Sequence, residues 1–302
     1  MLLTIAKIFE KSVKEKFLNY LDHINYFSEK QYGFLRNKST DMALFTHITN
    51  ITDGIEKNNL SAGVYPDLAK AFDTVNHKLL IKKLENIGIR EPLLGWFITY
   101  LHERSHCVKI NNTPSSQLKM KHGVPQGSVL GPLLFNIYIN DLFNLPLKAK
   151  ITGYADDTSL LYSSASTEEI NEDFEHDQQI LTPWFREHLL HLNINKCVGI
   201  IYSFKDTERG SHVKFKMENR EIEKVEHVKY LGLKIDRKLT WREHCLELQG
   251  KLRKLNYLFF HLKKHMNVKH LKKIYGPLYE SVFNYGIIHW GASKHIRPLK
   301  VL

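Results

Sequence analysis

The sequence predicts an α+β fold built around an antiparallel sheet. Helical apolar patterns occupy both ends of the chain, whereas short β-prone segments alternate with helical patterns in the middle. The 302 residues are enough to bury one large core or two smaller ones, and a hydrophobic content of 43% is typical of a globular chain. No internal repeat, low-complexity tract or flexible linker interrupts these patterns.

The first predicted element is an amphipathic helix over residues 5–21. Apolar side chains recur there at helical spacing and are expected in the core: Ile5, Ile8, Phe9, Val13, Phe17 and Leu21. A second helical pattern covers residues 79–87 and ends before Gly88. Its apolar stripe, also expected in the core, consists of Leu79, Leu80, Leu84 and Ile87.

A short strand-like run over residues 62–65 leads to the first candidate site residue, Asp67, and a helical pattern follows. An acid at the end of a strand can face a reaction site. Asp73 is the rival acid, but it has an ordinary explanation as a helix-start residue favoured by the helix dipole. We therefore prefer Asp67.

Residues 123–135 form a loop punctuated by Gly and Pro that runs into an apolar helix. Its glycines allow the backbone to approach a ligand closely, and Gln126 can both donate and accept hydrogen bonds. Pro132 suits the first turn of the helix. A loop without any function could have the same composition, so this segment alone leaves both interpretations open.

The strongest signal is the stretch Tyr154-Ala155-Asp156-Asp157. The β-prone segments 151–154 and 158–162 flank it, so both acids are expected at the tip of a hairpin. Adjacent carboxylates repel each other, and a divalent cation with hard oxygen ligands relieves that repulsion. An Asp-Asp turn without function is the alternative. A two-metal centre also needs a carboxylate from elsewhere, and Asp67 is the candidate.

Later elements follow from capping signals and β-prone runs. Ser166 to Glu169 reads as a capping box that opens a helix, and Pro183 is expected to kink or end it. Strands are expected at 197–204 and 227–235. A second capping box, Thr240 to Glu243, opens a basic helix toward His265.

The order of these segments resembles the reverse transcriptase of a non-LTR (LINE-type) retrotransposon, over nearly the whole chain. The matching segments, in order, are Gln31 to Phe34 with Ser39 and Thr40 (fingers), the block around Asp67 (motif A), Tyr100, Leu101, Arg104 and Val108 (before motif B), Gly123 to Leu134 (motif B), Tyr154 to Asp157 (motif C), Leu192, Asn193 and Lys196 (motif D), Tyr230 to Gly232 with Trp241 and His244 (motif E and thumb entrance), and Tyr285, Gly286 and His289 to Gly291 (after the thumb helices). Many motifs in the family's order make chance an unreasonable explanation.

The resemblance implies a right-hand polymerase fold with an antiparallel palm sheet and a helical thumb. Residues 1–60 would be partial fingers and residues 61–235 the palm with inserted finger elements. Residues 236–302 would form the thumb and the start of the following segment. The basic helix from Thr240 suits a thumb that lies along a duplex, although a solvated charged face is an equal alternative.

The implied activity is RNA-directed DNA polymerisation, in which two metal ions assist transfer of a nucleotide from a dNTP to a primer 3′ hydroxyl. By the resemblance, Asp67, Asp156 and Asp157 would hold two Mg²⁺ ions, with Mn²⁺ as the alternative ion. Lys196 would act as a general acid toward the departing pyrophosphate. Outside this context a solvent-facing lysine would be the simpler interpretation.

The same resemblance implies how the partners, an RNA template, a DNA primer and dNTPs, are bound. Phe72 matches the bulky residue beneath the sugar that excludes a 2′ hydroxyl, although an ordinary core Phe is the alternative. The residues lining the nucleotide and template pocket would be Gln126, Gly127, Tyr154 and Ala155. The backbone of Leu231 and Gly232 would grip the primer end, a strand bend being the alternative.

The sequence departs from the family pattern at Pro66, where the family has a bulky aliphatic residue, and at Leu35, where it has an arginine that Arg36 could partly replace. Proline lacks a backbone donor and is poorly tolerated in a central strand. The chain also carries no endonuclease region and stops soon after the thumb-like segment. We therefore expect a truncated or decaying copy with weak or absent activity.

Two other functions remain open at this stage. One is a catalytically dead remnant that only binds nucleic acid. The other is a viral-type RNA-dependent RNA polymerase, which Phe72 and the Ala155 in place of a glycine disfavour.

Composition agrees with a nucleic-acid partner. Lys and Arg number 43 against 32 Asp and Glu, a net charge of +11, although a generic basic protein would look the same. The three cysteines, Cys107, Cys197 and Cys245, have no metal-ligand spacing and suit a reducing compartment. No apolar stretch approaches the roughly 20 residues that cross a bilayer. We expect an intracellular protein without membrane contact, and the resemblance implies the nucleus.

Overall fold

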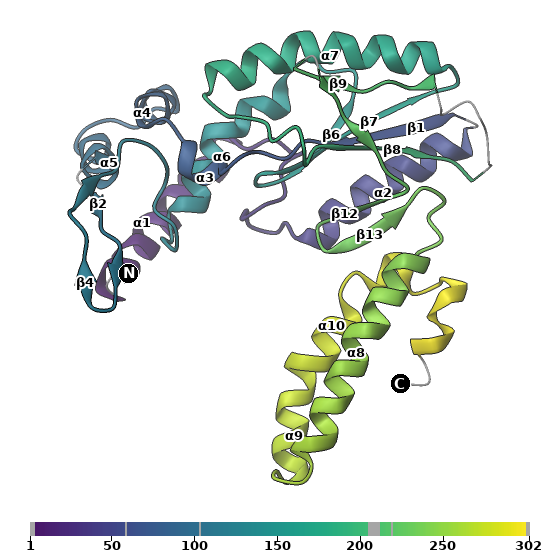
Figure 1. Ribbon diagram of the computed structural model, residues 1–302. Coiled ribbons are helices and arrows are strands. Elements are labelled where there is room, and N and C mark those ends of the chain that lie inside the picture. The colour runs from purple at the N-terminus through teal and green to yellow at the C-terminus, as the bar shows by residue number, and fades with distance from the viewer. Residues whose placement is uncertain (1–3, 58, 103, 205–211, 219, 300–302) are drawn as a thin grey trace.

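The computed structural model describes residues 4–57, 59–102, 104–204, 212–218 and 220–299 (Figure 1). Its longer helices are α1 (Thr4–His23), α2 (Thr40–Glu56), α4 (His77–Asn86), α5 (Leu93–His102), α6 (Gly131–Ile139), α7 (Thr167–Glu187), α8 (Arg242–Leu262) and α9 (Val268–Tyr275). Its short helical segments are α3 (Ala71–Thr74), η1 (Asn140–Asn144), η3 (Gly276–Glu280), α10 (Ser281–Asn284), α11 (Ile287–Trp290) and η4 (Lys294–Leu299).

A five-stranded sheet with the order β11-β8-β1-β7-β6 organises the chain. Its strands are β1 (Leu60–Tyr65), β6 (Lys150–Tyr154), β7 (Asp157–Ser164), β8 (Val198–Tyr202) and β11 (Glu223–Lys224). The central strand β1 runs antiparallel to both β7 and β8, and β6 is antiparallel to β7. Only the edge strand β11 is parallel to its neighbour within this sheet. The α+β class and the antiparallel sheet that the sequence predicts are therefore confirmed.

The remaining strands form short two-stranded pairs. They are β2 (Ser105–His106) with β5 (Leu118–Lys119), β3 (Lys109–Ile110) with β4 (Thr113–Pro114), β9 (Lys216–Met217) with β10 (Arg220–Glu221), and β12 (His227–Tyr230) with β13 (Leu233–Asp236). The first two pairs form one arm, and the last pair lies between the sheet and α8.

The sheet separates two apolar cores because successive side chains of β1 point to opposite faces. Ala62 and Val64 belong to the core that α6 and α7 cover. Tyr65 belongs to the second core, which α2, the β12–β13 pair and α8 cover. Figure 1 shows α7 on one face of the sheet and α2 on the other. Every residue of β1 is buried, as expected for a strand covered on both faces.

Pro66 lies one residue beyond the paired part of β1. The last pairs of that strand are Val64 with Leu160 and Tyr65 with Val198. A proline at this position interrupts no ladder bond within β1, because the strand has already ended. The central strand is therefore intact despite the proline.

The first half of α1 contradicts the prediction that its whole apolar stripe is buried. Phe17 and Leu21 are in the core, but Ile5 is 80% exposed and Ile8 and Phe9 are also exposed. Before Glu10 the helix is mostly exposed, although the Phe9 ring contacts the Trp96 ring with centroids 5.7 Å apart. The Glu10 carboxylate accepts a hydrogen bond from Val129 N at 2.8 Å. Periodicity alone could not show where this packing stops. The stripe of α4 is as expected, with Leu80 and Leu84 fully buried and Leu79 and Ile87 partly buried.

The two predicted capping boxes differ in outcome. Ser166 caps α7 by accepting from the backbone N–H groups of Glu168 and Glu169. The capping box expected from Thr240 does not form, because Trp241 is the N-cap residue of α8 and makes no side-chain cap, although Thr240 Oγ1 accepts from Arg242 N at 3.4 Å. Instead, the Asp236 carboxylate accepts from Thr240 N at 2.9 Å and from Trp241 N at 2.6 Å. An acid at the end of β13 thus holds the turn before the helix.

Two further expectations about regular structure are corrected: α7 does not end at Pro183, and residues 227–235 are not a single strand. The helix α7 continues through Pro183 to Glu187. Pro183 is exposed, so the carbonyl that its missing N–H leaves unpaired can face water. The single strand expected over 227–235 is a hairpin, because Leu231 and Gly232 both have positive φ, 44° and 84°, and form a two-residue turn.

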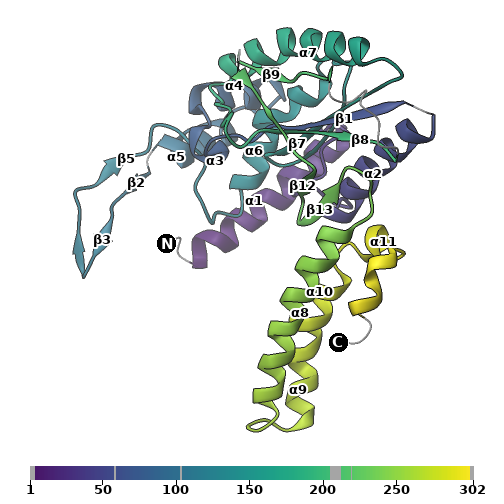
Figure 2. The same ribbon diagram turned by 45° about the vertical axis from the view of Figure 1, so that its right-hand side comes forward.

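Two appendages extend away from the sheet (Figures 1 and 2). One is the helical hairpin of α8 and α9, and the other is the β-arm that contains β2 to β5. In the described part of the chain, no helix combines the length and apolar character needed to cross a membrane.

A buried acid joins α7 to the start of β6. Asp177 is fully buried and its two carboxylate oxygens accept from Lys148 N at 2.8 Å and Ala149 N at 2.9 Å. These charge-assisted bonds fix the strand that leads to the acidic hairpin tip.

We expect Asp177→Ala to lower the free energy of unfolding by about 3 kcal/mol, because two buried N–H donors lose their acceptor. Urea denaturation followed by circular dichroism measures the change. Glu175→Ala, at an exposed position of the same helix, should change it by less than about 0.5 kcal/mol. Equal losses in the two variants would contradict a specific role for Asp177.

Candidate active site

The three predicted acids lie at one end of the sheet. Tyr154 pairs directly with Asp157, so Ala155 and Asp156 form the two-residue turn between β6 and β7. The strand β1 runs antiparallel to β7, which brings the end of β1 beside the start of β7. Asp67, two residues after β1, therefore lies next to the hairpin tip that carries Asp156 and Asp157.

The charges of the three acids act on one another. Burial raises the pKa of Asp157 to about 6, and the charges of Asp156 and Asp67 add to the increase. Burial also raises the pKa of Asp156, and the charge of Asp67 contributes. Asp73 is not among the groups that raise the pKa of Asp156 or Asp157. Its Oδ1 instead accepts from Gln126 Nε2 at 2.9 Å. Of the two rival acids, Asp67 is the one that faces the Asp156–Asp157 pair.

The chemistry of this trio fits a divalent cation, although the side chains do not yet surround one. Carboxylate oxygens are the ligands that Mg²⁺ prefers, and no ion pair within the described part of the chain neutralises any of the three acids. Within the same residues, no group of three or more His, Cys, Asp and Glu side chains is arranged to hold an ion. Binding would thus require the carboxylates to rotate toward a common point.

Gln31, which forms a backbone bridge with Gly153 of β6, holds the acidic turn. Its Oε1 accepts from Ala155 N at 2.9 Å and from Gly33 N at 2.8 Å, and its Nε2 donates to Ala155 O at 3.4 Å. The side chain is fully buried, so these bonds do not compete with water. Ala155 has a φ of 55°, a conformation that costs free energy for a residue with a Cβ. The bonds to Gln31 stabilise that conformation.

Gly33 is required by the close approach of two backbones. A Cβ added to Gly33 would lie 2.3 Å from Ala155 N, which is impossible without displacing the acidic turn. Asn136 of α6 donates to Gly33 O at 2.6 Å and fixes the segment from its other side. Neither Gln31 nor Asn136 could be assigned a role from the sequence, because each lies more than 100 positions from its partner. The only signal for Gln31 was its membership of the matching fingers segment, and Asn136 lies just beyond the motif B match.

The segment after Asp67 pairs with residues 191–193. Asn193 N donates to Asp67 O at 2.8 Å, and Asp67 N donates to the Cys197 sulfur at 3.3 Å. Burial raises the pKa of the Cys197 thiol, so this cysteine stays protonated and acts as a neutral partner. Lys196 lies in the same turn and is exposed. Its backbone N–H donates to Asn193 O at 2.8 Å. Within the described residues its ammonium group has no ion-pair partner.

The two segments that resemble motifs A and B are joined. Phe72 stacks on Phe135 of α6 with ring centroids 4.3 Å apart and an interplanar angle of 24°. Val124 N donates to Phe72 O at 2.8 Å. Gln126 and Gly127 are exposed beside this junction, where they can contact a ligand. Phe72 is therefore partly buried, with its ring stacked on Phe135 and its backbone bonded to Val124.

The turn between β12 and β13 is fixed from the C-terminal helices. Leu231 O accepts from Tyr285 Oη at 2.6 Å. A Cβ added to Gly232 would lie 2.9 Å from the Tyr285 ring, and the φ of 84° also favours glycine there. The turn is thus held against the segment that follows the helical hairpin, which the sequence pattern did not indicate.

A buried polar network lies on the α2 face of the sheet. His47 Nε2 and Tyr65 Oη are 2.6 Å apart, and Tyr65 Oη and Tyr202 Oη are also 2.6 Å apart. The other ring nitrogen of His47 is 3.2 Å from Ser159 Oγ. Burial lowers the pKa of His47 to about 3, so the imidazole remains neutral at physiological pH.

This network connects the strands that carry the acids. Tyr65 precedes Asp67 by two residues, and Ser159 follows Asp157 by two. Tyr230, the residue before the β12–β13 turn, approaches Ser159 Oγ at 3.5 Å. Hydrogen bonds among buried groups are directional, so they fix the relative positions of α2, the sheet and the turn.

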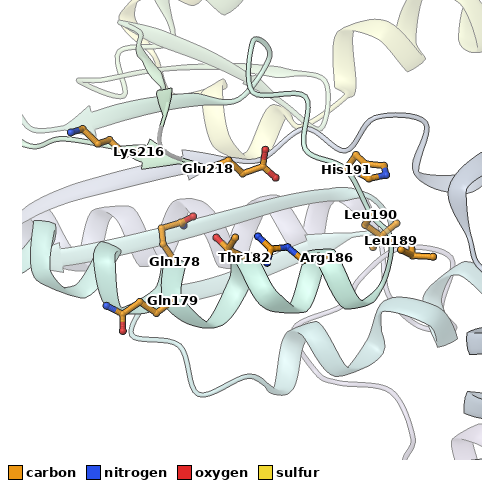
Figure 3. Close-up of a pocket in the computed structure, with 9 residues that line it drawn as sticks. All are labelled: Gln178, Gln179, Thr182, Arg186, Leu189, Leu190, His191, Lys216 and Glu218. Carbon is orange, nitrogen blue, oxygen red and sulfur yellow. The ribbon is translucent and has the colours of Figure 1, made fainter.

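A cavity of about 630 Å³ lies beside α7 and is separate from the acids. Figure 3 shows Gln178, Thr182 and Arg186 projecting from α7, with Glu218 and His191 on the opposite side. None of the predicted site residues lines it. It is linked to the segment after Asp67 through the backbone, where Ala69 N donates to His191 O at 2.8 Å. We therefore place the candidate site at the acids rather than at this cavity.

Comparison with protein families matches residues 1–235 to the family described as reverse transcriptase (RNA-dependent DNA polymerase). Among curated proteins, the chain is 27% identical to the probable RNA-directed DNA polymerase from transposon BS of Drosophila melanogaster, covering 100% of this chain and 34% of that protein. It is 26% identical to the RNA-directed DNA polymerase from mobile element jockey of the same species, with the same two coverages. The chain thus spans about a third of the length of these relatives.

Solved structures agree on the fold. Candida tropicalis telomerase in complex with a fragment of telomeric RNA has a TM-score of 0.50 and 16% identity, over 76% of this chain and 36% of that one. Candida albicans telomerase, also in complex with a telomeric RNA fragment, has a TM-score of 0.50 and 12% identity, over 95% of this chain and 52% of that one. The predicted right-hand polymerase fold is confirmed.

The acidic trio predicts a pH-dependent stability. The folded-state pKa of Asp157, about 6, lies above its ordinary value of 3.8, so the folded chain binds more protons than the unfolded chain between these values. The destabilisation is fully present above pH 6 and disappears as the pH falls toward 3.8. Without divalent cations, Asp157→Asn should therefore be more stable than the unsubstituted chain at pH 8, and this advantage should vanish near pH 4.

Chemical denaturation in EDTA at a series of pH values measures this difference. Asp53→Asn, at an exposed position of α2, is the matched control and should show no such pH-dependent advantage. If the difference between Asp157→Asn and the unsubstituted chain were constant over the whole range, the raised pKa of Asp157 in the folded chain would be refuted.

Proposed function

Because the chain belongs to the reverse transcriptase (RNA-dependent DNA polymerase) family, we propose that it is the polymerase part of a non-LTR retrotransposon protein and copies RNA into DNA. The observation that carries this proposal is the electrostatic coupling of Asp67 with Asp156 and Asp157 at one end of the antiparallel sheet. Relatives from Drosophila transposons that carry the name RNA-directed DNA polymerase support it. By the same likeness the protein would act in the nucleus on an RNA template, a DNA primer and dNTPs.

In this proposal the right-hand fold divides as the sequence pattern suggests. Residues 1–60 form part of the fingers, residues 61–235 the palm with inserted finger elements, and residues 236–302 the thumb and the start of the next segment. The central sheet supports the palm assignment, and the projecting hairpin of α8 and α9 supports the thumb assignment (Figure 1).

Asp67, Asp156 and Asp157 would hold two Mg²⁺ ions, or Mn²⁺ in their place. When bound, such ions promote attack of a primer 3′ hydroxyl on the α-phosphate of a dNTP and neutralise the pyrophosphate that leaves. The bonds from Gln31 keep the acidic turn in place before substrate arrives. A preorganised turn avoids the free-energy cost of ordering the acids during the reaction.

Phe72 would select dNTPs over NTPs by occupying the space that a 2′ hydroxyl needs. Its stacking on Phe135 and its backbone bond to Val124 restrict the ring, so it cannot easily move aside. Gln126 and Gly127 would contact the nucleotide and the template, and Tyr154 and Ala155 would line the same pocket.

Two further roles concern the product side. Lys196 is exposed close to Asp67 and would donate a proton to the departing pyrophosphate. The turn Leu231-Gly232 would hold the primer end through its backbone, and its contact with Tyr285 would couple this grip to the thumb.

A second candidate function is nucleic-acid binding without polymerisation. The observation that favours it is that, among the described residues, no three or more His, Cys, Asp and Glu side chains are arranged to hold a metal ion. The net charge of +11 would attract a phosphate backbone in either function, so it does not distinguish them.

Primer extension on an RNA template with a DNA primer, dNTPs and Mg²⁺ tests the proposal. Asp156→Asn should slow extension by at least about 100-fold, the scale of losing one charge-stabilising group in an active site. Asp53→Asn, exposed on α2, should extend at the unsubstituted rate. Salt-sensitive RNA binding without any extension by the unsubstituted chain would favour the second function.

The role of Phe72 has its own test. Phe72→Val should increase the rate of NTP incorporation relative to dNTP by about 10- to 200-fold, because the smaller side chain leaves room for the 2′ hydroxyl. Single-nucleotide incorporation with matched NTP and dNTP measures the ratio. Phe45→Val, at an exposed position of α2, should leave the ratio unchanged. The same ratio in all three proteins would argue against selection by Phe72.

A further inference from the structure

The β-arm, defined here as residues 104–122, has no assigned role. Its strands β2 and β5 form the base, and β3 and β4 continue it to a turn at Asn111 and Asn112, both with positive φ. Figure 2 shows the arm extending away from the helices at its base. All described side chains from Cys107 to Lys119 are exposed, so the arm makes little contact with the rest of the chain.

The charge of the arm has one sign. No Asp or Glu occurs between Glu103 and Asp141, whereas Lys109, Lys119 and Lys121 lie within the arm. These three ammonium groups are exposed and have no ion-pair or hydrogen-bond partner among the residues that the structure describes. A surface with several free cations and no acid attracts a phosphate backbone.

The base of the arm is anchored rather than loose. The guanidinium of Arg104 lies 4.3 Å from the centre of the Tyr100 ring and 3.5 Å from the Glu10 carboxylate. Met120 N donates to Arg104 O at 2.9 Å and closes the base of the arm. Arg104 is thus occupied in holding the arm, and the free charges lie farther out.

The arm leaves the body directly beside the proposed nucleotide and template pocket. Residue 122 bridges to Asn76, and Gly123 N donates to Val75 O at 2.7 Å. Gln126, which is proposed to contact the nucleotide, follows within a few residues and binds Asp73. The base of the arm therefore adjoins the proposed pocket.

We infer that the β-arm binds the phosphate backbone of the unpaired template strand before that strand reaches the active site. This inference rests on the proposed polymerase function. The duplex is assigned to the other appendage, the helical hairpin of α8 and α9, which leaves the single-stranded template for the arm. A protein partner is the competing occupant, because Val108, Ile110 and Leu118 are 58%, 68% and 62% exposed. The free lysines and the absence of acids favour nucleic acid.

The test compares two triple variants with the same loss of charge. One carries Lys109→Ala, Lys119→Ala and Lys121→Ala in the arm. The control carries Lys57→Ala, Lys78→Ala and Lys82→Ala, at exposed positions of other elements. Fluorescence anisotropy without dNTPs measures Kd over a range of salt concentrations. The two probes are a blunt RNA–DNA duplex and the same duplex with an unpaired template extension of about ten nucleotides.

We expect the unsubstituted chain and the control to bind the extended probe more tightly than the blunt probe. The arm variant should lose this preference and still bind the blunt duplex as before. Its plot of log Kd against log salt for the extended probe should be less steep by about 2, the value for three lost single-strand phosphate contacts. Matching circular dichroism spectra exclude unfolding.

Other outcomes overturn the inference in distinguishable ways. An equal loss on both probes would assign the arm to the duplex. Unchanged binding of both probes would exclude a nucleic-acid role, and a shift in oligomeric state caused by Val108→Ser, Ile110→Ser and Leu118→Ser would then assign the arm to a protein contact. Failure of the unsubstituted chain to bind either probe would overturn the polymerase proposal as well. If the unsubstituted chain binds both probes and the arm variant binds them with the same affinities, only the proposed role of the arm is overturned.

Discussion

The mutual repulsion of three carboxylates is the constraint to which the rest of this structure is adapted. Asp67 follows the end of β1, whereas Asp156 lies in the turn between β6 and β7 and Asp157 is the first residue of β7. Antiparallel pairing of β1 with β7 brings them together. Burial is the largest cause of the raised pKa values of the two hairpin acids, and the neighbouring charges add to it. Holding these charges close requires rigid support, because repulsion between the carboxylates favours conformations in which they lie farther apart.

That support consists mainly of neutral, buried hydrogen bonds. Gln31 bonds the acidic turn through its amide, and Cys197 accepts from the backbone of Asp67 as a protonated thiol. His47 stays neutral because burial lowers its pKa to about 3. Neutral partners fix the geometry without neutralising the acids, so the negative charge remains available for cations. A lysine or arginine in place of Gln31 or Cys197 could not accept these N–H bonds, and its charge would compete with metal ions.

Positive charge is instead found on the projecting parts of the chain. The β-arm has free lysines and no acid, and the sequence from Leu248 to Tyr279, which contains most of the helical hairpin, also has no Asp or Glu. Such a separation, with an acidic centre and basic appendages, suits a protein whose substrate is a polyanion that must be held at a distance from the acids. The buried network from His47 to Tyr230 ties the sheet to the β12–β13 turn, so the acidic centre and one appendage are positioned together.

The sequence by itself determined the α+β class, the hairpin position of Asp156 and Asp157, and the choice of Asp67 as the third acid. These features depend on local periodicity and turn chemistry, which short segments contain. It misjudged the first half of α1, the continuation of α7 through Pro183 and the hairpin at Leu231. Those outcomes depend on where a helix meets its neighbours and on which residues adopt positive φ. Only the tertiary structure decided that Gln31 and Asn136 support the acidic turn and that His47 joins three strands. Contacts between residues more than 100 positions apart arise from packing of the whole chain, and no local pattern encodes them.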